Sequence, residues 1–525
     1  MMSNNRLILA AALLLAAFFN FSFFLHAAEV YPPAVGNLAF LASLFVLLTA
    51  CHILLLGMVA WRFVTRPLLI TVFLVSSLAA YFMDTYNVII DDGMIRNIAK
   101  TDVGEAVDLY SPMLVVYFVL LGVLPSVFIY RVTVKTESLA TALVSRLKIM
   151  AVALVVLAAV VLLFGKTYAS FFREHKTVRF YANPTYYIYS AAEYISDTFR
   201  DTGKAVAPLG TDARIPPTDQ DRELIVLVVG ETARADRFSL NGYARETNPL
   251  LKKEDVFSFT NVHSCGTSTA VSVPCMFSVF GHGRFTSTNA ITNENLLDVL
   301  SHAGINVLWR DNNSDSKGVA LRVPYESFKQ DNSNTVCDTE CRDEGMLVGL
   351  QEYVDKTTRG DIVIVLHQMG NHGPAYFKRY PQEFEKFTPV CASSELDRCS
   401  VEEIGNAYDN AILYTDYFLS RVIAFLKQND AGFETAMVYV SDHGESLGEN
   451  GLYLHGMPYM IAPQEQTHVP AILWFGKNYH IDRGDLRLHM SHPYSHDNIF
   501  HTILGLVEIQ SEVYRPELDL VHHED

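Results

Sequence analysis

The 525-residue sequence predicts an α-helical membrane domain followed by an α/β domain with a mostly parallel sheet. Five apolar runs, each close to the ~20 residues needed to cross a bilayer, lie before Gly165. After Asp221, short apolar runs alternate with helical patterns, as in parallel sheets whose two faces are covered by helices. We therefore expect a membrane domain over residues 1–170, a connector over 171–220 and a soluble domain over 221–525.

The five apolar runs are expected to be transmembrane helices over about 7–25, 35–61, 67–86, 113–130 and 149–164. A cleaved signal peptide is the alternative for the first run, but the second follows at once and no small-residue cleavage site stands out. The loops after the second and fourth runs are basic, with Arg62, Arg66, Arg131, Lys135, Arg146 and Lys148. The loop after the third is acidic, with Asp84, Asp91, Asp92, Asp102, Glu105 and Asp108. The positive-inside rule then places the N-terminus in the cytoplasm and everything after the fifth run outside.

Three segments link these domains or the spans within them. Asp84–Ser111 mixes apolar and polar residues and is expected to form short helices at the outer membrane surface. Phe171–Thr202 is rich in Phe and Tyr, which favour the bilayer interface, so we expect an amphipathic connector on the headgroups. An ordinary packing helix is the alternative. Gly203–Asp221 has the Gly, Pro, Asp and Thr content of a linker.

Charge and cysteine content narrow the class of protein. A net charge of −17 argues against a nucleic-acid partner, because phosphate backbones need a basic surface. Cys51 lies in an apolar run and is expected to be a buried free thiol. The other six cysteines lie in the C-terminal half, outside the cytoplasm on the predicted topology, so we expect disulfides rather than reduced thiols or a zinc knuckle. They form three close pairs in sequence, and neighbour pairing is the simplest of the possible connectivities: Cys265, Cys275, Cys337, Cys341, Cys391 and Cys399.

Five apolar segments of the soluble domain are expected to be buried strands. These are Leu224–Val229, Ile305–Trp309, Ile362–Leu366, Ala436–Val440 and Pro470–Phe475, with helices such as Glu294–Ala303 and Ile404–Gln428 between them. Ligands of such sheets bind at the carboxyl ends of strands. Glu231 follows the first strand, His367 closes the third, and Asp442 and His443 follow the fourth, so distant positions should meet at one sheet edge.

Glu231, Thr269, Asp442 and His443 together form a ligand set that suits zinc. Metal coordination would also make the Thr269 hydroxyl a usable nucleophile. A helix is expected to begin near Thr269, within about a turn before Pro274, so that its N–H groups face a phosphate. Taken singly, Thr269 could be a helix N-cap, Glu231 a cap and Asp442-His443 a loop salt bridge. Thr267 and Ser268 remain chemically plausible nucleophiles.

A second polar group could bind and neutralise a phosphoryl group. Lys317 offers a point charge, and histidines can donate to phosphate oxygens, protonate a leaving oxygen or bind a second metal. The group consists of Asn313, Lys317, His367, His372 and His455. Glu445 could support a metal ligand, and His468, His492 and His496 stay undecided. These residues favour a two-step phosphoryl transfer, in which Thr269 attacks a phosphodiester and a second alcohol or phosphate then takes the group.

Four segments carry a resemblance to a known family: VVGETARADRFSLNGYARETNP, SCGTSTAVSVPCMFS, HQMGNHGPAY and SDHGESLGENGLYLHG. They resemble the lipid A phosphoethanolamine transferases, which include the mobile colistin-resistance enzymes. The resemblance covers nearly the whole chain. It implies an alkaline-phosphatase-like or sulfatase-like soluble domain on a five-helix anchor, and a multi-pass protein of the bacterial inner membrane with its catalytic domain in the periplasm.

The resemblance also implies an activity and a set of residues. Phosphoethanolamine would pass from phosphatidylethanolamine to a lipid A phosphate through Thr269. This modification would lower the negative charge of the outer surface and give resistance to polymyxin and colistin. Zinc would be held by Glu231, Thr269, Asp442 and His443, with a second zinc possible in turnover. Asn313, Lys317, His372 and His455 would bind substrate. The implied disulfides are Cys265–Cys275, Cys337–Cys341 and Cys391–Cys399.

Three other functions stay open at this point. The acceptor could be an inner-core sugar or a periplasmic glucan, because related transferases share these motifs. A membrane-bound sulfatase or phosphatase would hand the intermediate to water, although Thr269 cannot form the formylglycine that sulfatases generally use. A membrane sensor or transporter with an inactive outer domain is a third class. We expect a monomer embedded in the membrane.

Overall fold

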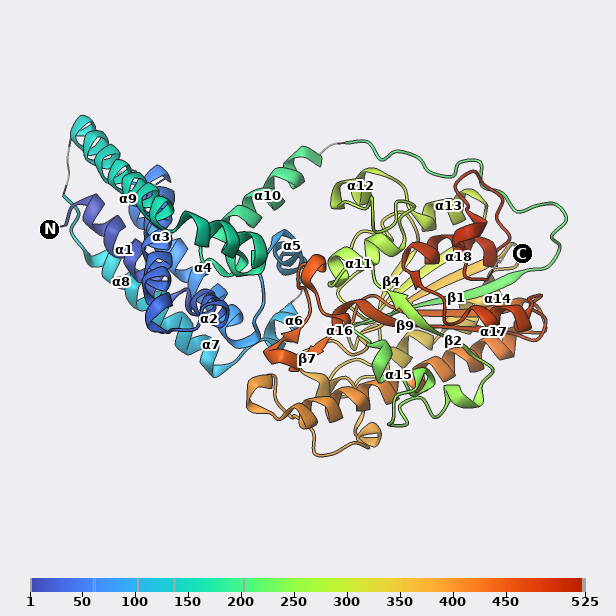
Figure 1. The fold of residues 1–525 in the computed structure, drawn as a ribbon. Coiled ribbons are helices and arrows are strands. Elements are labelled where there is room, and N and C mark those ends of the chain that lie inside the picture. The colour runs from blue at the N-terminus through green and yellow to red at the C-terminus, as the bar shows by residue number, and fades with distance from the viewer. Residues whose placement is uncertain are drawn as a thin grey trace. The chain divides into compact units, whose positions relative to one another are not determined.

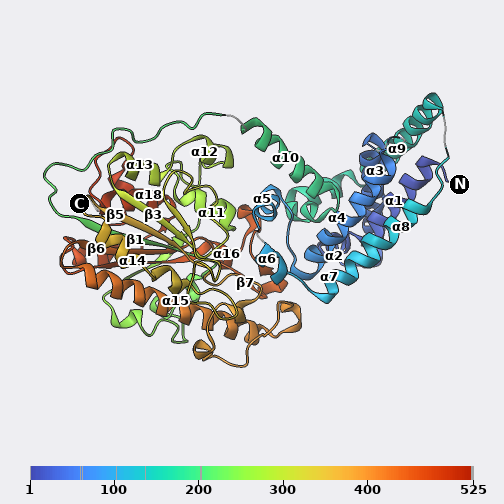
Figure 2. The same ribbon diagram turned by 180° about the vertical axis from the view of Figure 1, so that it is seen from behind.

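A computed structural model describes residues 2–59, 61, 63–101, 103–135, 138–201 and 204–521. The chain forms two compact units (Figures 1 and 2). The first comprises Met1–Ile95 and Tyr110–Ser196, and the second comprises Arg96–Leu109 and Asp197–Asp525. Arg62 and Asp102, which the sequence places in a basic and an acidic loop, lie outside the described residues.

The first unit is built from long apolar helices. α3 (Val35–Val59), α4 (Thr65–Tyr86) and α9 (Leu139–Glu174) are long and apolar enough to cross a membrane. So is the stretch formed by α7 (Pro112–Tyr117), η1 (Phe118–Val123) and α8 (Leu124–Arg131). The first predicted span is a pair of helices, α1 (Asn4–Phe18) and α2 (Phe21–Val30), bent by 55°. Counted as one crossing, the pair completes the five predicted spans.

The break between α1 and α2 has a side chain at its centre. Asn20 Nδ2 donates to Leu15 O (2.9 Å) and to Asn183 O (2.7 Å), and Asn20 Oδ1 accepts from Asn183 N (3.0 Å). An asparagine that bonds nearby main-chain groups competes with the helical pattern, which explains the bend. The prediction of the first span as a single apolar run did not anticipate this break.

Part of the aromatic connector packs inside the first unit. η2 (Lys176–Tyr181) and α10 (Thr185–Asp201) carry it. Tyr181 and Tyr187 are buried there, and the Tyr187 hydroxyl lies 3.2 Å from Ser76 Oγ of α4. For these two side chains the packing interpretation of the connector is the one that the structure supports.

The loop between α4 and α7 forms two short helices, α5 (Asp92–Lys100) and α6 (Val103–Asp108), as predicted. From Arg96 to Leu109 this loop folds with the second unit. Lys100 Nζ donates to Lys317 O at 3.1 Å. The Asp108 carboxylate pairs with Lys378 Nζ at 2.6 Å and with Arg379 Nη2 at 2.7 Å. The second unit is therefore assembled from two separate stretches of chain.

An eight-stranded sheet forms the centre of the second unit, in the order β10-β2-β9-β6-β1-β5-β3-β4. β6, β1, β5, β3 and β4 run parallel to one another, β2 and β10 pair in parallel, and β9 runs antiparallel to β6 and β2. The strands are β1 (Glu223–Gly230), β2 (Phe257–His263), β3 (Asn306–Asp311), β4 (Tyr325–Ser327), β5 (Ile362–His367), β6 (Glu434–Ser441), β9 (His468–Phe475) and β10 (Tyr494–Ser495). A separate hairpin pairs β7 (Ser446–Leu447) with β8 (Tyr453–Leu454). The mostly parallel sheet and its five predicted strands are confirmed.

Helices cover both faces of the sheet (Figures 1 and 2). Ile225, Leu227 and Val229 of β1 pack with α11 (Thr269–Met276), α13 (Leu296–His302) and α18 (Asp497–Leu506) in one buried cluster. The long α15 (Val401–Asn429) lies on the other face, with its apolar positions buried. Because both faces are covered, β1 is apolar along almost its whole length, which is why its sequence shows no alternation.

The six cysteines of the second unit form the bridges Cys265–Cys275, Cys337–Cys341 and Cys391–Cys399. Neighbours in sequence are therefore paired. Cys51 is free, and it is half-buried rather than fully buried as we expected.

Candidate metal and phosphoryl-transfer site

The sheet brings the predicted metal ligands to one edge. β1 lies between β5 and β6 and is parallel to both, with Val229 opposite His367 and Gly230 opposite Ser441. The carboxyl ends of the three strands therefore coincide. Glu231 follows β1 directly, and Asp442 and His443 follow β6.

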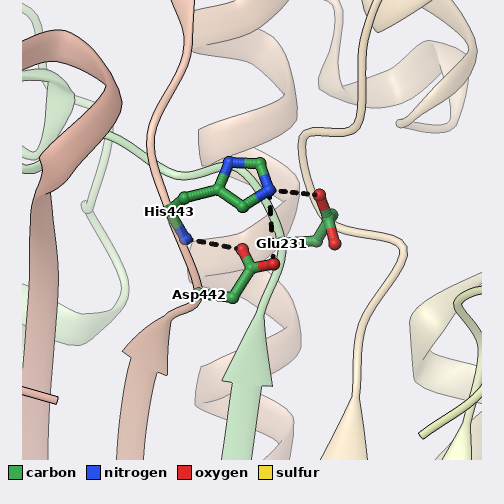
Figure 3. Close-up of side chains that lie close together, drawn as sticks. All are labelled: Glu231, Asp442 and His443. Carbon is green, nitrogen blue, oxygen red and sulfur yellow. Dashed lines mark hydrogen bonds and ion pairs between the residues drawn. The ribbon is translucent and has the colours of Figure 1, made fainter. Parts of the chain in front are cut away.

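Glu231, Asp442 and His443 converge on one point (Figure 3). Each offers a ligand atom, and these atoms all lie within 4.8 Å of one another. His443 Nε2 is 3.5 Å from Glu231 Oε1 and 3.4 Å from Asp442 Oδ2. All three side chains are fully buried. His443 Nδ1 lies 2.9 Å from Gly444 O, which fixes the ring with Nε2 turned toward the two carboxylates.

The Thr269 hydroxyl lies in the same group. Its Oγ1 donates to Glu231 Oε2 at 3.1 Å and lies 3.3 Å from His443 Nε2. Thr269 is the first residue of α11, and Ser268 is the N-cap residue, so the N-cap alternative for Thr269 is wrong. The helix begins five positions before Pro274, slightly further upstream than the proline suggested. Thr267 Oγ1 donates instead to Met457 O at 2.6 Å.

The donor set fits a divalent cation. Two carboxylates, an imidazole and a hydroxyl are ligands that zinc accepts. Asp442 Oδ2 is buried and accepts no hydrogen bond from any described residue. Burial and the Glu231 carboxylate raise the pKa of Asp442 to about 6. Burial opposes ionisation of Glu231 too, but the imidazoles of His443, His372 and His455 hold its pKa below the usual value. A cation between the two carboxylates would relieve this repulsion.

Asn313 and Lys317 come from the loop after β3. Asn313 Nδ2 donates to Glu231 Oε2 at 2.8 Å and to Gln368 O at 2.8 Å, so it joins the site directly. Lys317 is buried beside it, and its Nζ donates to Ser314 O at 3.3 Å and to Ser314 Oγ. Lys317 thus lies next to the ligand group, and its ammonium donates to Ser314 within the same loop.

His455 lies beside the ligand His443, and His372 lies beside His455. The His455 ring centroid is 4.4 Å from that of His443 and 5.8 Å from that of His372. His455 Nδ1 lies 3.2 Å from Glu445 Oε2, which gives Glu445 its supporting contact. Burial lowers the pKa of His455, but Glu445 outweighs it and raises the value to about 9. Burial lowers the pKa of His372 to about 3.

The remaining predicted histidines differ in the groups that they contact. His367 Nδ1 lies 2.9 Å from Asp311 Oδ2, and this carboxylate outweighs burial and raises the pKa of His367. His367 therefore adjoins the site through Asp311 rather than through a ligand contact. His496 is buried, accepts from Cys265 N and lies 2.9 Å from Ser441 O, so both ring nitrogens serve the main chain. His468 bonds Thr260 O, and His492 packs against His489.

Comparisons with known proteins agree with this geometry. The chain is 45% identical over 514 residues to phosphatidylethanolamine transferase Mcr-2 of Escherichia coli, covering 95% of this chain and 94% of that protein. The chain belongs to the phosphoethanolamine transferase family. Phosphoethanolamine transferase EptA of Escherichia coli K12 is 39% identical to this family member over 530 residues, covering 98% and 96% of the two chains.

A solved structure and two family descriptions extend the match. The integral membrane lipooligosaccharide phosphoethanolamine transferase A of Neisseria meningitidis superposes on this family member with a TM-score of 0.95 at 36% identity, covering 98% of each chain. Residues 48–199 match the family described as phosphoethanolamine transferase EptA/EptB, and residues 223–509 match the sulfatase family. The membrane domain with an alkaline-phosphatase-like soluble domain is therefore confirmed.

Two features of this family member's site were not predicted from its sequence. Thr232 adopts a positive φ of 58°, donates from Oγ1 to Glu231 Oε1, and donates from its N–H to Asp442 Oδ1 at 3.0 Å. Asp311, the last residue of β3, holds His367. Thr232 follows a candidate ligand and Asp311 ends an apolar strand, so position alone could have drawn attention to both.

Proposed function

We propose that this chain transfers phosphoethanolamine from phosphatidylethanolamine to a phosphate of lipid A through a phosphothreonine intermediate on Thr269. One observation carries the proposal. The Thr269 hydroxyl, at the N-terminus of α11, faces Glu231 and His443 at 3.1 and 3.3 Å in a member of the phosphoethanolamine transferase family. The relatives named above are themselves phosphatidylethanolamine or phosphoethanolamine transferases.

The proposed cofactor is one Zn²⁺ held by Glu231, Thr269, Asp442 and His443. When bound, zinc lowers the pKa of a coordinated hydroxyl and neutralises charge on a phosphoryl group. The buried carboxylates, and an Asp442 Oδ2 that accepts no hydrogen bond from any described residue, support a cation at this place. His372 and His455, close to this ligand set, are where a second zinc could bind during turnover.

In the first step, Thr269 Oγ1 forms a bond to the phosphorus of the donor, and the bond from phosphorus to the glycerol oxygen breaks. Diacylglycerol leaves, and the proton of the threonine hydroxyl ends on its oxygen. His372 and His455 lie where they could pass this proton. Asn313 and the first N–H groups of α11 can bind the phosphoryl oxygens, with the Lys317 charge nearby.

In the second step, an oxygen of the acceptor phosphate forms a bond to the phosphorus, and the bond from phosphorus to Thr269 Oγ1 breaks. The proton of the acceptor phosphate ends on Oγ1, which restores the hydroxyl. The acceptor gains an amine on an anionic phosphate, so its negative charge falls. Weaker attraction of cationic peptides follows, and polymyxin and colistin resistance is the expected phenotype.

The proposed setting is the bacterial inner membrane. Residues 1–170 would anchor the enzyme in the membrane, and residues 221–525 would form the catalytic domain in the periplasm. Residues 171–220 would connect these two domains. Both substrates are lipids, so a membrane anchor keeps the site within reach of their headgroups. We propose that a monomer suffices, because each residue of the proposed site comes from one chain.

Purified full-length protein in detergent, with fluorescent phosphatidylethanolamine as donor, tests the proposal. Wild type should release diacylglycerol and gain a phosphoethanolamine adduct on Thr269, located by mass spectrometry of peptides. Thr269→Ala should lose the adduct and the transfer, with an unchanged thermal unfolding profile. Thr267→Ala and Ser268→Ala are the matched controls, and both should keep the adduct. An adduct that persists in Thr269→Ala would move the nucleophile elsewhere.

The same reaction mixture separates the other functions. Transfer to purified lipid A supports the proposal. Release of phosphoethanolamine to water without transfer favours a phosphatase, and transfer to a core sugar or glucan in place of lipid A changes the acceptor. A folded chain that binds no zinc and cleaves no donor favours a membrane sensor.

A further inference from the structure

A pocket lies beside α11, within the second unit. One wall consists of Ala270 and Pro274 of α11. α12 (Ser287–Thr292) and the residues just before it form a second wall, with Phe285 and Ile291 among them. Arg96 and Lys100 of α5 close a third side. Lys317, which belongs to the loop of the candidate site, also lines the pocket, so the pocket adjoins that site.

Positive charge is concentrated in this pocket. Three cations line it, namely Arg96, Lys100 and Lys317, against one carboxylate, Glu294. Lys100 Nζ donates to Lys317 O at 3.1 Å, which holds the two lysines together. Burial, opposed by Asp315 and aided by the charges of Lys317 and Arg96, lowers the pKa of Lys100. Cations gathered against their mutual repulsion are typical of an anion-binding site.

The nearby carboxylates are largely engaged with other groups. Glu294 Oε2 accepts from Leu209 N at 2.9 Å and lies 2.8 Å from His302 Nε2. Asp315 Oδ1 accepts from Lys317 N. Glu105 lies on the Ser314 side of Lys317 and forms an ion pair with Lys329 at 3.6 Å. The one carboxylate that lines the pocket, Glu294, therefore makes its described contacts with groups other than the three cations.

We propose that this pocket binds the phosphate of the glycolipid acceptor, with Arg96 and Lys100 as its cationic ligands. The inference rests on the proposed function and extends it to the second substrate. The donor phosphorus must lie at Thr269 itself, among Asn313, His372 and His455. The pocket begins one residue further along α11, at Ala270, so it can present a different phosphate to the phosphothreonine.

The pocket also suits an amphiphile. Phe285, Ile291 and Pro274 give it apolar surface beside the cations, and Ser287 and Asn289 add polar side chains. A phosphorylated sugar that carries acyl chains has this combination of groups. The phosphate of the phospholipid donor has the same charge chemistry as the phosphate of the acceptor. The experiment therefore distinguishes donor binding from acceptor binding.

The experiment uses the full chain in detergent and measures two reactions separately. Donor cleavage is followed as diacylglycerol release without acceptor, and transfer is followed against the concentration of bisphosphorylated lipid A. The variants are Lys100→Met and Arg96→Gln, which remove charge but keep most of the side chain. Transfer should show an acceptor KM raised about tenfold or more, as for a lost charge-assisted hydrogen bond. Donor cleavage should keep the wild-type rate.

Lys252→Met removes an exposed lysine that does not line the pocket, and it should change neither reaction. Lys100→Arg should restore a near-normal acceptor KM because it restores the charge. An unchanged acceptor KM in both charge-removing variants would overturn the inference. Donor cleavage that falls in parallel with transfer would also overturn it, since the pocket would then serve the donor. If wild type cleaves no donor, the proposed function itself fails, which is a separate result.

Discussion

Three adjacent hydroxyls, those of Thr267, Ser268 and Thr269, differ in what surrounds them. Thr267 donates to Met457 O, and Ser268 stands at the N-cap of α11. The Thr269 oxygen faces Glu231 Oε2 and His443 Nε2. The helix start therefore selects one hydroxyl for the ligand group, because consecutive residues of a helix point in directions about 100° apart.

Gly444 is a residue whose missing side chain matters to the site. It lies between His443 and Glu445, and a Cβ built there would be 2.1 Å from Glu465 O. A main-chain oxygen cannot move aside as a flexible side chain can. Gly444→Ala should therefore displace His443, reduce the zinc bound per chain, and cost about 1–3 kcal/mol in stability. Metal analysis and thermal unfolding of the purified chain measure the two effects.

Gly432→Ala is the control for that substitution, because nothing lies within 4 Å of its Cβ position. It should leave metal content and unfolding unchanged. Full zinc content in Gly444→Ala would show that His443 tolerates the displacement or does not bind the metal.

At the scale of elements, the Cys265–Cys275 bridge spans the turn that carries Thr269. Cys265 precedes α11 and Cys275 lies within it, ten residues on. We expect the Cys265→Ala/Cys275→Ala double variant to lose about 2–4 kcal/mol of stability. It should also lose transfer activity, because the turn is no longer held. The Cys337→Ala/Cys341→Ala variant is the matched comparison, since its bridge closes a short loop that does not contain Thr269. Equal activity in the two variants would contradict this role.

The central strands could be predicted because burial on both faces leaves an uninterrupted apolar run. β1, β5 and β6 have such a run. Because ligands bind where these strands end, the runs also pointed to Glu231, His367 and Asp442-His443 as site residues. β2 was missed because its sequence, FSFTNVH, alternates between buried and more exposed positions and includes polar residues. β10 and β7 have two residues each, too few for any period. The bend at Asn20 depends on Asn183, which is 163 residues away, so no local pattern announces it.

At the scale of the whole molecule, the fold brings two carboxyl groups together at the sheet edge opposite the candidate site. Glu223 begins β1 and Asp361 precedes β5, and both side chains are buried and in contact. Burial and the Asp361 carboxylate raise the pKa of Glu223 well above its usual 4.5. Above pH 4.5 the unfolded chain releases this proton while the folded chain keeps it. Stability should therefore be greatest at acidic pH and fall as pH rises toward the raised pKa.

Glu223→Gln should flatten this dependence, because an amide can donate to Asp361 without titrating. One proton accounts for at most about 1.4 kcal/mol per pH unit. The slopes of stability against pH are compared by thermal unfolding of the full chain in detergent between about pH 5 and about pH 8. In this range unfolding releases roughly one proton from Glu223. Glu383→Gln, at an exposed position, should keep the wild-type slope. A wild-type stability that does not fall with pH over this range would exclude a proton shared by Glu223 and Asp361.

The segment Arg96–Leu109 has a consequence for how the protein is made. A ribosome produces Lys100 217 residues before its partner Lys317, and Asp108 271 residues before its partner Arg379. The early segment is exported between two inserted helices before its partners have been made. Its contacts with Lys317 and Arg379 can form only after the later half of the chain has crossed the membrane. A fragment that begins after α10 lacks it entirely and leaves Arg379 without the Asp108 carboxylate. In the full chain, these contacts of the soluble unit can therefore form only after the later half of the chain has been exported.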